Sequence, residues 1–418
     1  MNEQRSPIKA DRTQTRRSRA RLTLPLLGPA FVAAVAYVDP GNFATNTTAG
    51  ARYGTLLIWV VVSANLMAML VQWLSASLGL ATGKGLADVC REQWSRPVSL
   101  GLWLQAEVVA MATDLAEIVG SAVALNLLFG IPALPAGVIA ALVAMALLQL
   151  ERRGYRRFEL AIVGLLAIIL AGFLYSAFRA GGDPSGLIDG LVPRFDGSQS
   201  VLLAVGILGA TVMPHVVYLH SALVAKRPGE RDVASIRKRL KASRTDVLVA
   251  LGLAGVVNVA MLWVAATLLH DLPGKTVDTL EGAYSAFGDV AGMSTAVAFA
   301  LALLASGFAS ASVGTYAGQV IMEGFTGWRI PLLLRRLLTL LPALLVLGIG
   351  VNPTAALILS QVVLSFGIPF ALIPLVIFTA QRSVMGQWVV SRKATAIACV
   401  VATVIVSLNV LLLIDLLG

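Results

Sequence analysis

The chain contains 418 residues, of which 57% are hydrophobic and 13% are charged, and its formal net charge is +10. This composition is too apolar for an ordinary soluble protein, so it predicts a polytopic membrane protein. The only two cysteines, Cys90 and Cys399, exclude a disulfide framework and a cluster of metal-binding thiolates.

Residues 1–23 form a polar, arginine-rich tail without the small-residue cleavage site of a signal peptide, so we expect the first span to be the targeting signal. The apolar runs that follow are long enough to cross a bilayer, and they predict an all-α bundle of eleven transmembrane helices without a separate soluble domain. They lie at residues 24–51, 54–81, 100–130, 132–150, 158–178, 199–225, 246–270, 290–322, 331–350, 354–380 and 394–416.

The basic residues predict the orientation of these spans. With a cytoplasmic N-terminus, 28 of the 32 Lys and Arg residues fall in the tail and the inner loops. The outer segments then contain only Arg52, Arg179, Arg194 and Lys275. The positive-inside rule therefore predicts a multi-pass membrane protein with the N-terminus in the cytoplasm and the C-terminus outside. The same placement of charge argues against nucleic acid as a partner.

The first span is interrupted at Ala36-Tyr37-Val38-Asp39-Pro40-Gly41-Asn42. A carboxylate near the bilayer centre costs about 2.5–3.5 kcal/mol on insertion scales, and such residues usually face a cavity and carry function. Pro40 has no N–H to donate to the carbonyl of Ala36, four residues earlier, so the helix is expected to open here.

The sixth span has a matching interruption at Ala210-Thr211-Val212-Met213-Pro214-His215, where Pro214 frees the carbonyl of Ala210. Spans one to five and six to ten form two halves, residues 24–178 and 199–380, and an odd number of spans gives the halves opposite orientations. An outer loop, residues 179–198, joins them, and residues 381–418 add an inner loop and the eleventh span. This is the layout of a LeuT-type 5+5 inverted repeat with discontinuous helices 1 and 6.

The two interruptions collect polar atoms that could bind a substrate. They supply a carboxylate, an amide oxygen, two freed carbonyls, a thioether and an imidazole, from Asp39, Asn42, Ala36, Ala210, Met213 and His215. No basic residue adjoins Asp39 in the sequence, so a cation is the expected ligand. The soft sulfur favours Mn²⁺, Fe²⁺, Co²⁺ or Cd²⁺ over Ca²⁺ and Mg²⁺. Taken alone, Asp39 could instead cap a half-helix and Met213 could fill the core.

The motifs Asp39-Pro40-Gly41-Asn42, Met213-Pro214-His215 and Gly314-Thr315-Tyr316-Ala317-Gly318-Gln319 resemble the Nramp family of proton-coupled divalent metal transporters. The resemblance implies Mn²⁺ and Fe²⁺ uptake with protons by alternating access. It also implies that Gln361 joins the ligands in one conformational state, in addition to Asp39, Asn42, Met213 and the carbonyls of Ala36 and Ala210. We expect no resident cofactor and a monomer in the lipid bilayer.

We expect Asp39 to bind the metal when it is ionised and to accept or release a proton during the transport cycle. Proton coupling also requires titratable groups that lead away from the metal site. Glu107, Asp114 and Glu117 of the third span fall within roughly 80° on one helix face. Arg335 and Arg336, where the ninth span begins, are the available basic partners, and the resemblance likewise suggests a proton path between these two spans. A static salt-bridge network is the structural alternative.

Two further features of the spans have both a functional and a structural interpretation. His215 and His220 could share the proton relay, because histidine titrates near neutral pH, or they could be hydrogen-bonded core residues. Gly314 and Gly318 form a small-xxx-small pair, which predicts close helix packing.

The sequence argues against three other functions. A LeuT-type amino-acid or Na⁺-coupled carrier would keep half-helix N-termini open to a substrate carboxylate, whereas Asp39 already places an anion there. An intramembrane metalloprotease would need His-Glu-x-x-His, and His215, His220 and His270 lack that spacing. A non-transporting metal receptor would need a signalling domain, and none follows the bundle in this sequence.

Overall fold

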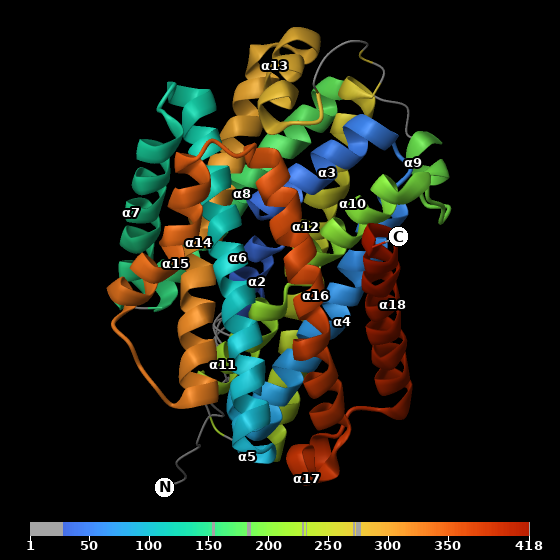
Figure 1. Ribbon diagram of the computed structural model, residues 1–418. Coiled ribbons are helices and arrows are strands. Elements are labelled where there is room, and N and C mark those ends of the chain that lie inside the picture. The colour runs from blue at the N-terminus through green and yellow to red at the C-terminus, as the bar shows by residue number, and fades with distance from the viewer. Residues whose placement is uncertain are drawn as a thin grey trace, which may run out of the picture.

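The computed structural model describes residues 28–417, apart from 153–154, 182–184, 228–229, 231, 271 and 273–276. In this part of the chain every regular element is a helix, and the long helices pack into a bundle (Figure 1). The predicted tail and the first residues of span one lie outside the described residues. The elements are α2 (Pro29–Ala36), α3 (Pro40–Tyr53), α4 (Ile58–Thr82), α5 (Leu86–Gln93), α6 (Arg96–Phe129), α7 (Ala133–Arg152), α8 (Tyr155–Ala180), α9 (Ser185–Asp189), α10 (Gly197–Thr211), α11 (Pro214–Lys226), α12 (Val233–Leu269), α13 (Leu280–Ala291), α14 (Met293–Thr326), α15 (Leu332–Gly348), α16 (Pro353–Ala380), α17 (Arg382–Met385), η2 (Gly386–Trp388) and α18 (Arg392–Leu417).

The all-α membrane class predicted from the sequence is confirmed. Within the described residues, eight helical segments are long and apolar enough to cross a membrane, with α10 and α11 counted together. The other three predicted spans correspond to the pair α2 and α3, which is interrupted at residues 37–39, to α7 with 20 residues, and to α15 with 17 residues.

One helix extends well beyond its predicted apolar run. The sequence predicts a span from residue 246, but α12 begins at Val233. Asp232 caps this start, because its Oδ2 accepts hydrogen bonds from the backbone N–H groups of Ala234 (3.1 Å) and Ser235 (3.3 Å). The predicted inner loop is therefore helical over residues 233–245, where a capped polar segment continues the apolar helix.

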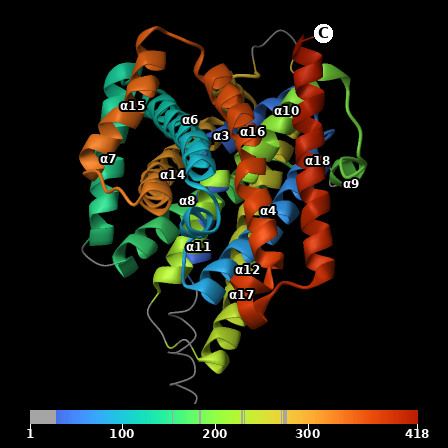
Figure 2. The same cartoon turned by 60° about the horizontal axis from the view of Figure 1, so that its bottom comes forward.

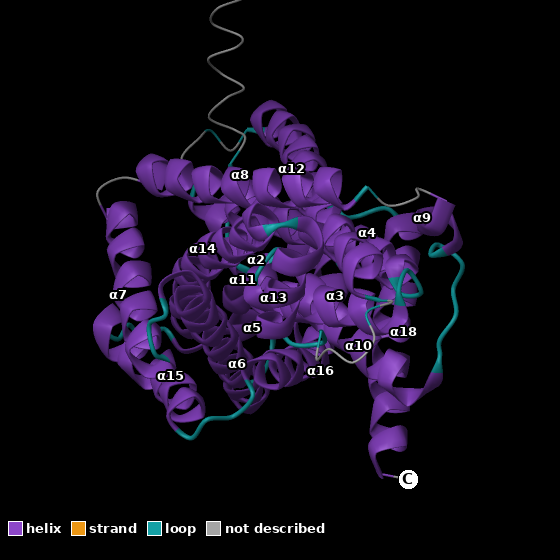
Figure 3. Ribbon diagram, turned by 90° about the horizontal axis from the view of Figure 1, so that it is seen from above, coloured by secondary structure: helices purple, strands orange, loops and turns teal. Residues whose placement is uncertain are grey.

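The two interrupted pairs lie at the centre of the bundle. In the view along the bundle, α2, α3 and α11 are surrounded by longer helices (Figure 3), while α7 and α15 lie on one side and α18 lies on the opposite side (Figure 2). Residues 40–51 of α3 and 214–225 of α11 are all buried. The half-helices that follow the two breaks are therefore core elements, although α3 contains many polar residues.

The helix α16 passes through two prolines without a break. Pro369 and Pro374 lie inside it, and they remove the N–H donors for the carbonyls of Ser365 and Phe370. A missing N–H predicts a break at Pro40, and it would equally predict breaks at Pro369 and Pro374. The helix α16 stays continuous because neighbouring helices supply hydrogen-bond donors to the two freed carbonyls.

Side chains from two other helices satisfy these carbonyls. The Asn409 Nδ2 of α18 donates to the Ser365 oxygen at 3.0 Å, and the Tyr218 hydroxyl of α11 donates to the Phe370 oxygen at 3.3 Å. The Asn409 Oδ1 also accepts from the Ser365 hydroxyl at 2.8 Å. Each proline removes one backbone hydrogen bond from α16, and a side-chain hydrogen bond from a neighbouring helix replaces it.

Replacing Asn409 by leucine is expected to lower the free energy of unfolding by about 1–3 kcal/mol, because the buried Ser365 carbonyl would lose its donor. Unfolding in mixed detergent micelles measures this loss. Ser407→Leu is the matched control, since Ser407 is exposed on the same helix, and it is expected to leave stability unchanged. If Asn409→Leu were as stable as the native chain, the side-chain bond would not be what stabilises α16 at Pro369.

Candidate functional site

Both predicted interruptions are present. The helix α2 ends at Ala36 and α3 begins at Pro40, so residues 37–39 are not helical. Likewise α10 ends at Thr211 and α11 begins at Pro214. Each proline occupies the first turn of the second half-helix, where a missing N–H costs little and the fixed φ angle suits a helix start.

The Asp39 side chain has two different oxygen environments. Asp39 is the N-cap of α3, and its Oδ1 accepts from the backbone N–H of Asn42 at 2.8 Å and from the Asn42 Nδ2 at 2.9 Å. Its Oδ2 is buried and has no hydrogen-bond partner among the described residues. Capping therefore uses one oxygen, and the second is free to bind a cation in a place where an unpaired carboxylate oxygen is costly.

Asn42 connects the two interruptions. Its Nδ2 also donates to the Ala210 carbonyl at 2.9 Å, at the end of α10. The Thr211 hydroxyl donates to the Asn42 Oδ1 at 3.3 Å. The predicted carboxylate, amide and second freed carbonyl are thus in direct contact, although Asp39 and Ala210 are far apart in sequence.

The first interruption leaves one carbonyl available. The Tyr37 carbonyl accepts from the Asn258 Nδ2 at 2.8 Å, and the Val38 carbonyl accepts from the Ser306 hydroxyl at 2.5 Å. No hydrogen bond within the described part of the chain uses the Ala36 carbonyl. The Ala36 carbonyl, which the position of Pro40 predicts to be free, therefore also receives no hydrogen bond from neighbouring helices.

Met213 lies within the second interruption, three residues after Ala210. It is the N-cap residue of α11, and its side chain is fully buried. An N-cap usually has a side-chain oxygen, because such an oxygen can accept a bond from the first turn. A thioether here makes no cap bond, so capping does not explain it.

Gln361 of α16 adjoins both interruptions. A Cβ atom on Gly41 would lie 2.0 Å from the Gln361 Nε2, and a Cβ on Gly209 would lie 1.8 Å from the Gln361 carbonyl oxygen. Only glycine at these two positions lets α16 approach so closely. The Gln361 Oε1 is buried without a partner among the described residues, while its Nε2 donates to the Ser360 hydroxyl.

These groups can hold a divalent cation through one carboxylate and several neutral ligands. Across the described residues, no group of three or more His, Cys, Asp or Glu side chains could hold a metal ion. A site with one formal negative charge leaves part of a divalent charge uncompensated. Such a site suits a cargo that must leave again, because transport requires binding that is favourable but reversible.

The predicted acidic stripe lies on α6 and faces α15. Both oxygens of Glu107 pair with Arg335, at 3.1 and 2.7 Å. The Asp114 Oδ1 pairs with the Arg336 Nη1 at 2.6 Å. All four side chains are mostly buried, and Arg336 is 1% exposed. The two arginines that the sequence offers as partners are therefore the partners in the structure.

Glu117 and Arg336 both retain unused hydrogen-bonding atoms. The Glu117 Oε2 and the Arg336 Nε and Nη2 atoms are buried, and none has a partner in the described part of the chain. One turn further along α6, a Cβ atom on Gly120 would lie 2.1 Å from the Pro40 Cβ. The stripe therefore reaches the first interruption.

The glycine pair of α14 makes room for charged side chains. A Cβ atom on Gly314 would lie 2.7 Å from the Glu117 Oε1, and one on Gly318 would lie 2.2 Å from the Arg335 Nη2. The prediction that this pair serves close packing of helices agrees with these approaches. The atoms nearest the two glycines belong to the Glu117 carboxylate of α6 and the Arg335 guanidinium of α15.

The two histidines of α11 have neutral partners. The His215 Nδ1 lies 3.2 Å from the Thr113 hydroxyl, and the His220 Nδ1 lies 2.8 Å from the Gln72 Oε1. The Nε2 atoms of both rings are buried without partners among the described residues. The structure brings His215 beside α6 but shows no hydrogen bond from either ring to the stripe, so the relay role stays a prediction.

Sequence reasoning missed several residues that position the site. Asp246 is buried, and its carboxylate accepts from the backbone N–H groups of Gly28 and Ala30, each at 3.1 Å, where α2 begins. An acidic residue at the end of an apolar run is the signal that could have revealed it. Thr315 accepts from the Arg336 Nη1 at 2.8 Å. Thr315 belongs to the motif at residues 314–319, but the motif does not indicate this contact, because a threonine in a transmembrane helix usually bonds within its own helix.

The candidate ligands are closed off in this conformation. Asp39, Asn42, Met213 and Gln361 are all at most 1% exposed. A cavity of about 350 Å³ lies between α3, α10 and α16, and its wall includes the ion pair of Arg52 and Asp278. None of the candidate ligands lines it.

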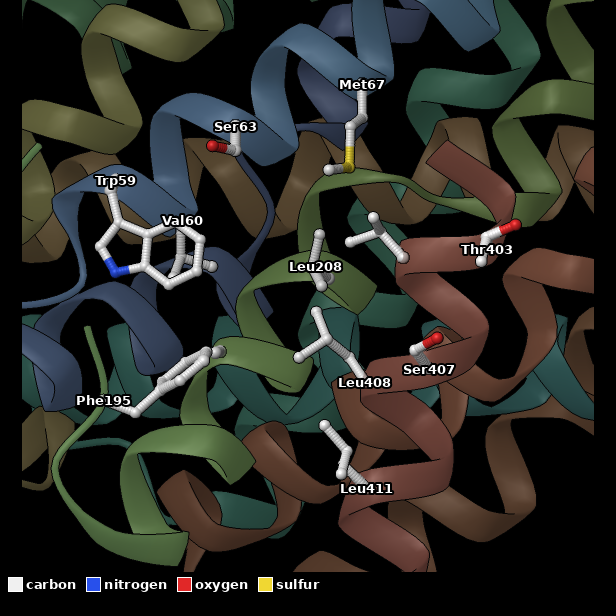
Figure 4. Close-up of a pocket in the computed structure, with 12 residues that line it drawn as sticks. Trp59, Val60, Ser63, Met67, Phe195, Leu208, Thr403, Ser407, Leu408 and Leu411 are labelled. Carbon is white, nitrogen blue, oxygen red and sulfur yellow. The ribbon is translucent and has the colours of Figure 1, made fainter. Parts of the chain in front are cut away.

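A second cavity, of about 240 Å³, is lined by α4, α10 and α18 and by Phe195. Trp59 and Phe195 lie at one end of it, and Leu208 and Leu408 lie in its middle (Figure 4). Its lining is almost wholly apolar. No carboxylate, imidazole or thiol lines this cavity, so the interruptions remain the candidate site.

The chain is similar to known transporters over nearly its whole length. Residues 30–415 match the Nramp family model, described as natural resistance-associated macrophage protein-like. The divalent metal cation transporter MntH of Bacillus subtilis is 50% identical over 393 residues, which cover 94% of this chain and 92% of the relative.

Solved structures agree with this similarity. A crystal structure of a variant of the Eremococcus coleocola manganese transporter has a TM-score of 0.85 and 32% identity, and the match covers 97% of this chain and 88% of the other. Mhp1, a transporter of the nucleobase-cation-symport-1 family, has a TM-score of 0.61 at 15% identity, over 92% of this chain and 91% of the other. The likeness to Mhp1 concerns the fold alone.

Proposed function

Because the chain belongs to the Nramp family, we propose that it imports divalent transition-metal ions together with protons. It is a membrane transporter and not an enzyme. The observation that carries the proposal is the unpartnered Asp39 Oδ2, buried where Asn42 joins the two interruptions. A cation bound there would satisfy an oxygen that nothing else in the described residues satisfies.

The proposed ligands bind the metal from both interruptions. Asp39 and Asn42 supply side-chain oxygens, Met213 supplies sulfur, and Ala36 and Ala210 supply backbone carbonyls. The cargo is Mn²⁺ or Fe²⁺, and Co²⁺ and Cd²⁺ also suit a mixed oxygen and sulfur set. Gln361 joins in one conformational state, which its unpartnered Oε1 supports.

Metal binding at this site requires a small rearrangement of Asn42. In the present conformation its Nδ2 contacts the Asp39 carboxylate and the Ala210 carbonyl. A cation would replace that amide group as their shared partner, and the Asn42 Oδ1 would turn toward the ion. The hydrogen bond that the Thr211 hydroxyl donates to the Asn42 Oδ1 would then be replaced by the bond from that oxygen to the ion.

The topology that we propose has eleven spans arranged as two inverted halves of five and one additional helix. The charge distribution supports a cytoplasmic location for the end of the bundle that holds α5 and α17. The end that holds α13 and the C-terminus then faces outward (Figure 1). The buried ligands fit a conformation closed on both sides, so import requires each side to open in turn. We expect a monomer in the bacterial inner membrane.

Protons would move along α6 by exchange of partners. Arg336 is paired with Asp114 and keeps unused donors, while Glu117 keeps an unused acceptor. A proton on Asp114 would weaken its bond to Arg336, and the guanidinium could then turn to Glu117. Glu107 with Arg335 continues the path toward the α5 end, and His215 and His220 are further candidate carriers.

The test uses purified chain in proteoliposomes with an acidic exterior, a divalent-ion indicator and a pH indicator inside. Native chain is expected to import Mn²⁺ and acidify the lumen. Asp114→Asn is expected to lower proton entry per Mn²⁺ by at least about tenfold, because a neutral amide cannot carry the proton. Glu92→Gln, at an exposed acidic residue of α5, is the control. Unchanged proton entry in Asp114→Asn would contradict the path, and absence of Mn²⁺ uptake by native chain would contradict the function.

A further inference from the structure

A cavity of about 430 Å³ opens at the α5 end of the bundle, apart from the candidate metal site. The first two turns of α6 and the end of α14 form most of its wall. Its lining includes two guanidinium groups, two hydroxyls and three aromatic rings, and no carboxylate. These groups belong to Arg91, Arg96, Ser99, Trp103, Phe325, Thr326 and Trp328. This composition favours an anion over a metal ion.

Ser99 is the feature that points to a ligand. Its side chain is 2% exposed and lines the cavity, and its Oγ has no hydrogen-bond partner among the described residues. The buried hydroxyls of Thr113 and Ser121 in the same helix, by contrast, each bond to the carbonyl four residues earlier. A buried hydroxyl without a partner is costly, and an anion in the cavity could accept a hydrogen bond from it.

The positive charge around the cavity is not fully neutralised. Arg96 forms no ion pair with any described residue. The amino end of α6 adds partial positive charge, and its N-cap residue, Ser95, makes no side-chain bond to the first turn. Arg91, by contrast, is already held by Asp88 at 3.4 Å and by the Glu323 carbonyl at 3.0 Å.

The carboxylates nearest the cavity already have basic partners. Asp88 pairs with Arg91, and Glu323 pairs with Arg329. Glu107 pairs with Arg335 and also accepts from the Trp103 Nε1 at 3.0 Å. An incoming anion would therefore meet Arg96, the Ser99 hydroxyl and the start of α6, without an unpaired carboxylate among these groups to repel it.

We propose that this cavity binds the phosphate group of a phosphate ester. Arg96 supplies a charge-assisted contact, the Ser99 hydroxyl donates to a phosphate oxygen, and the start of α6 supplies the field that phosphates find at helix N-termini. Two sources share this chemistry: an anionic phospholipid of the leaflet at this end, and a soluble phosphate compound. The 66% exposed Trp328 on the rim favours the lipid, because tryptophan gathers at membrane interfaces. This inference does not depend on metal transport.

The experiment is native mass spectrometry of the full chain in detergent, with phosphatidylglycerol, phosphatidylcholine, inorganic phosphate or ATP added separately. We expect phosphatidylglycerol to be retained about tenfold more than phosphatidylcholine. Arg96→Gln is expected to reduce that retention about tenfold, and Ser99→Ala is expected to reduce it by a smaller factor. Arg392→Gln, an exposed basic residue where α18 begins, is the matched control and should not change retention.

Each outcome decides between the sources or against the site. Loss of phosphatidylglycerol in Arg96→Gln and Ser99→Ala, but not in Arg392→Gln, supports the lipid source. Retention of inorganic phosphate or ATP that the same two substitutions abolish, without preference for phosphatidylglycerol, supports the soluble source. If Arg96→Gln and Ser99→Ala bind every probe as the native chain does, or if Arg392→Gln loses as much binding as they do, the proposal is overturned. Ser99→Ala removes one atom, so misfolding does not confuse the result.

Discussion

Replacing Asp39 by asparagine is expected to reduce Mn²⁺ uptake by roughly a hundredfold or more. Removing one partner of a buried charge pair costs about 3–5 kcal/mol, and each 1.4 kcal/mol is a factor of ten in binding. The substitution isolates the charge, because asparagine is also a good N-cap and its oxygen can still accept from the Asn42 N–H. The helix start at Pro40 is therefore preserved while the anionic ligand is lost.

The measurement is initial Mn²⁺ uptake into proteoliposomes at several metal concentrations, together with Mn²⁺ binding to the detergent-purified chain. Loss in both assays is expected. The unfolding temperature should stay close to that of native chain, which separates a missing ligand from a damaged fold. If Asp39→Asn transported Mn²⁺ as native chain does, the ion would have to bind elsewhere, and the two interruptions would serve another purpose.

Replacing Met213 by alanine is expected to let Ca²⁺ compete with Mn²⁺. Sulfur contributes little to Ca²⁺ binding but favours transition ions, so its removal lowers Mn²⁺ affinity and leaves Ca²⁺ affinity almost unchanged. In native chain a hundredfold excess of Ca²⁺ should barely slow Mn²⁺ uptake. In Met213→Ala the same excess should slow it by about tenfold.

The matched control is Met261→Ala, because Met261 is equally buried but lies on α12 outside both interruptions. Both substitutions leave a cavity, so both should lower stability by about 2–5 kcal/mol. Only Met213→Ala should change the response to Ca²⁺. Equal Ca²⁺ sensitivity in the two variants would mean that selectivity does not depend on the thioether.

The parts of the fold that were predictable depend on local chemistry. Hydropathy predicted helical runs, and the missing N–H of Pro40 and Pro214 placed two interruptions where α2 and α10 end. The same reasoning applied to Pro369 would be wrong, because Asn409 replaces the missing donor from another helix. Whether a proline breaks a helix therefore depends on tertiary neighbours that the sequence does not display.

The candidate site likewise contains residues that the sequence predicts and residues that only the structure reveals. Asp39 and Met213 could be found because a charge and a soft ligand are unexpected beside prolines in apolar runs. The partners of Asp114 and Glu107 could be inferred from the single pair of arginines that enters a span nearby. The roles of Asn258 and Ser306 could not be inferred from the sequence, because both side chains donate hydrogen bonds to backbone carbonyls more than 200 residues away in the chain.

The two side-chain bonds to α16 also determine how easily that helix can bend. At Ser365 and Phe370 the helix has no backbone bond of its own to lose, so flexing there is opposed by Asn409 and Tyr218. Asn409 belongs to α18, the last helix of the described chain, and Ser365 is one turn from Gln361. We therefore expect α18 to set the stiffness of α16 beside the candidate site, so that altering it changes how fast the bundle moves between states rather than which ion it binds.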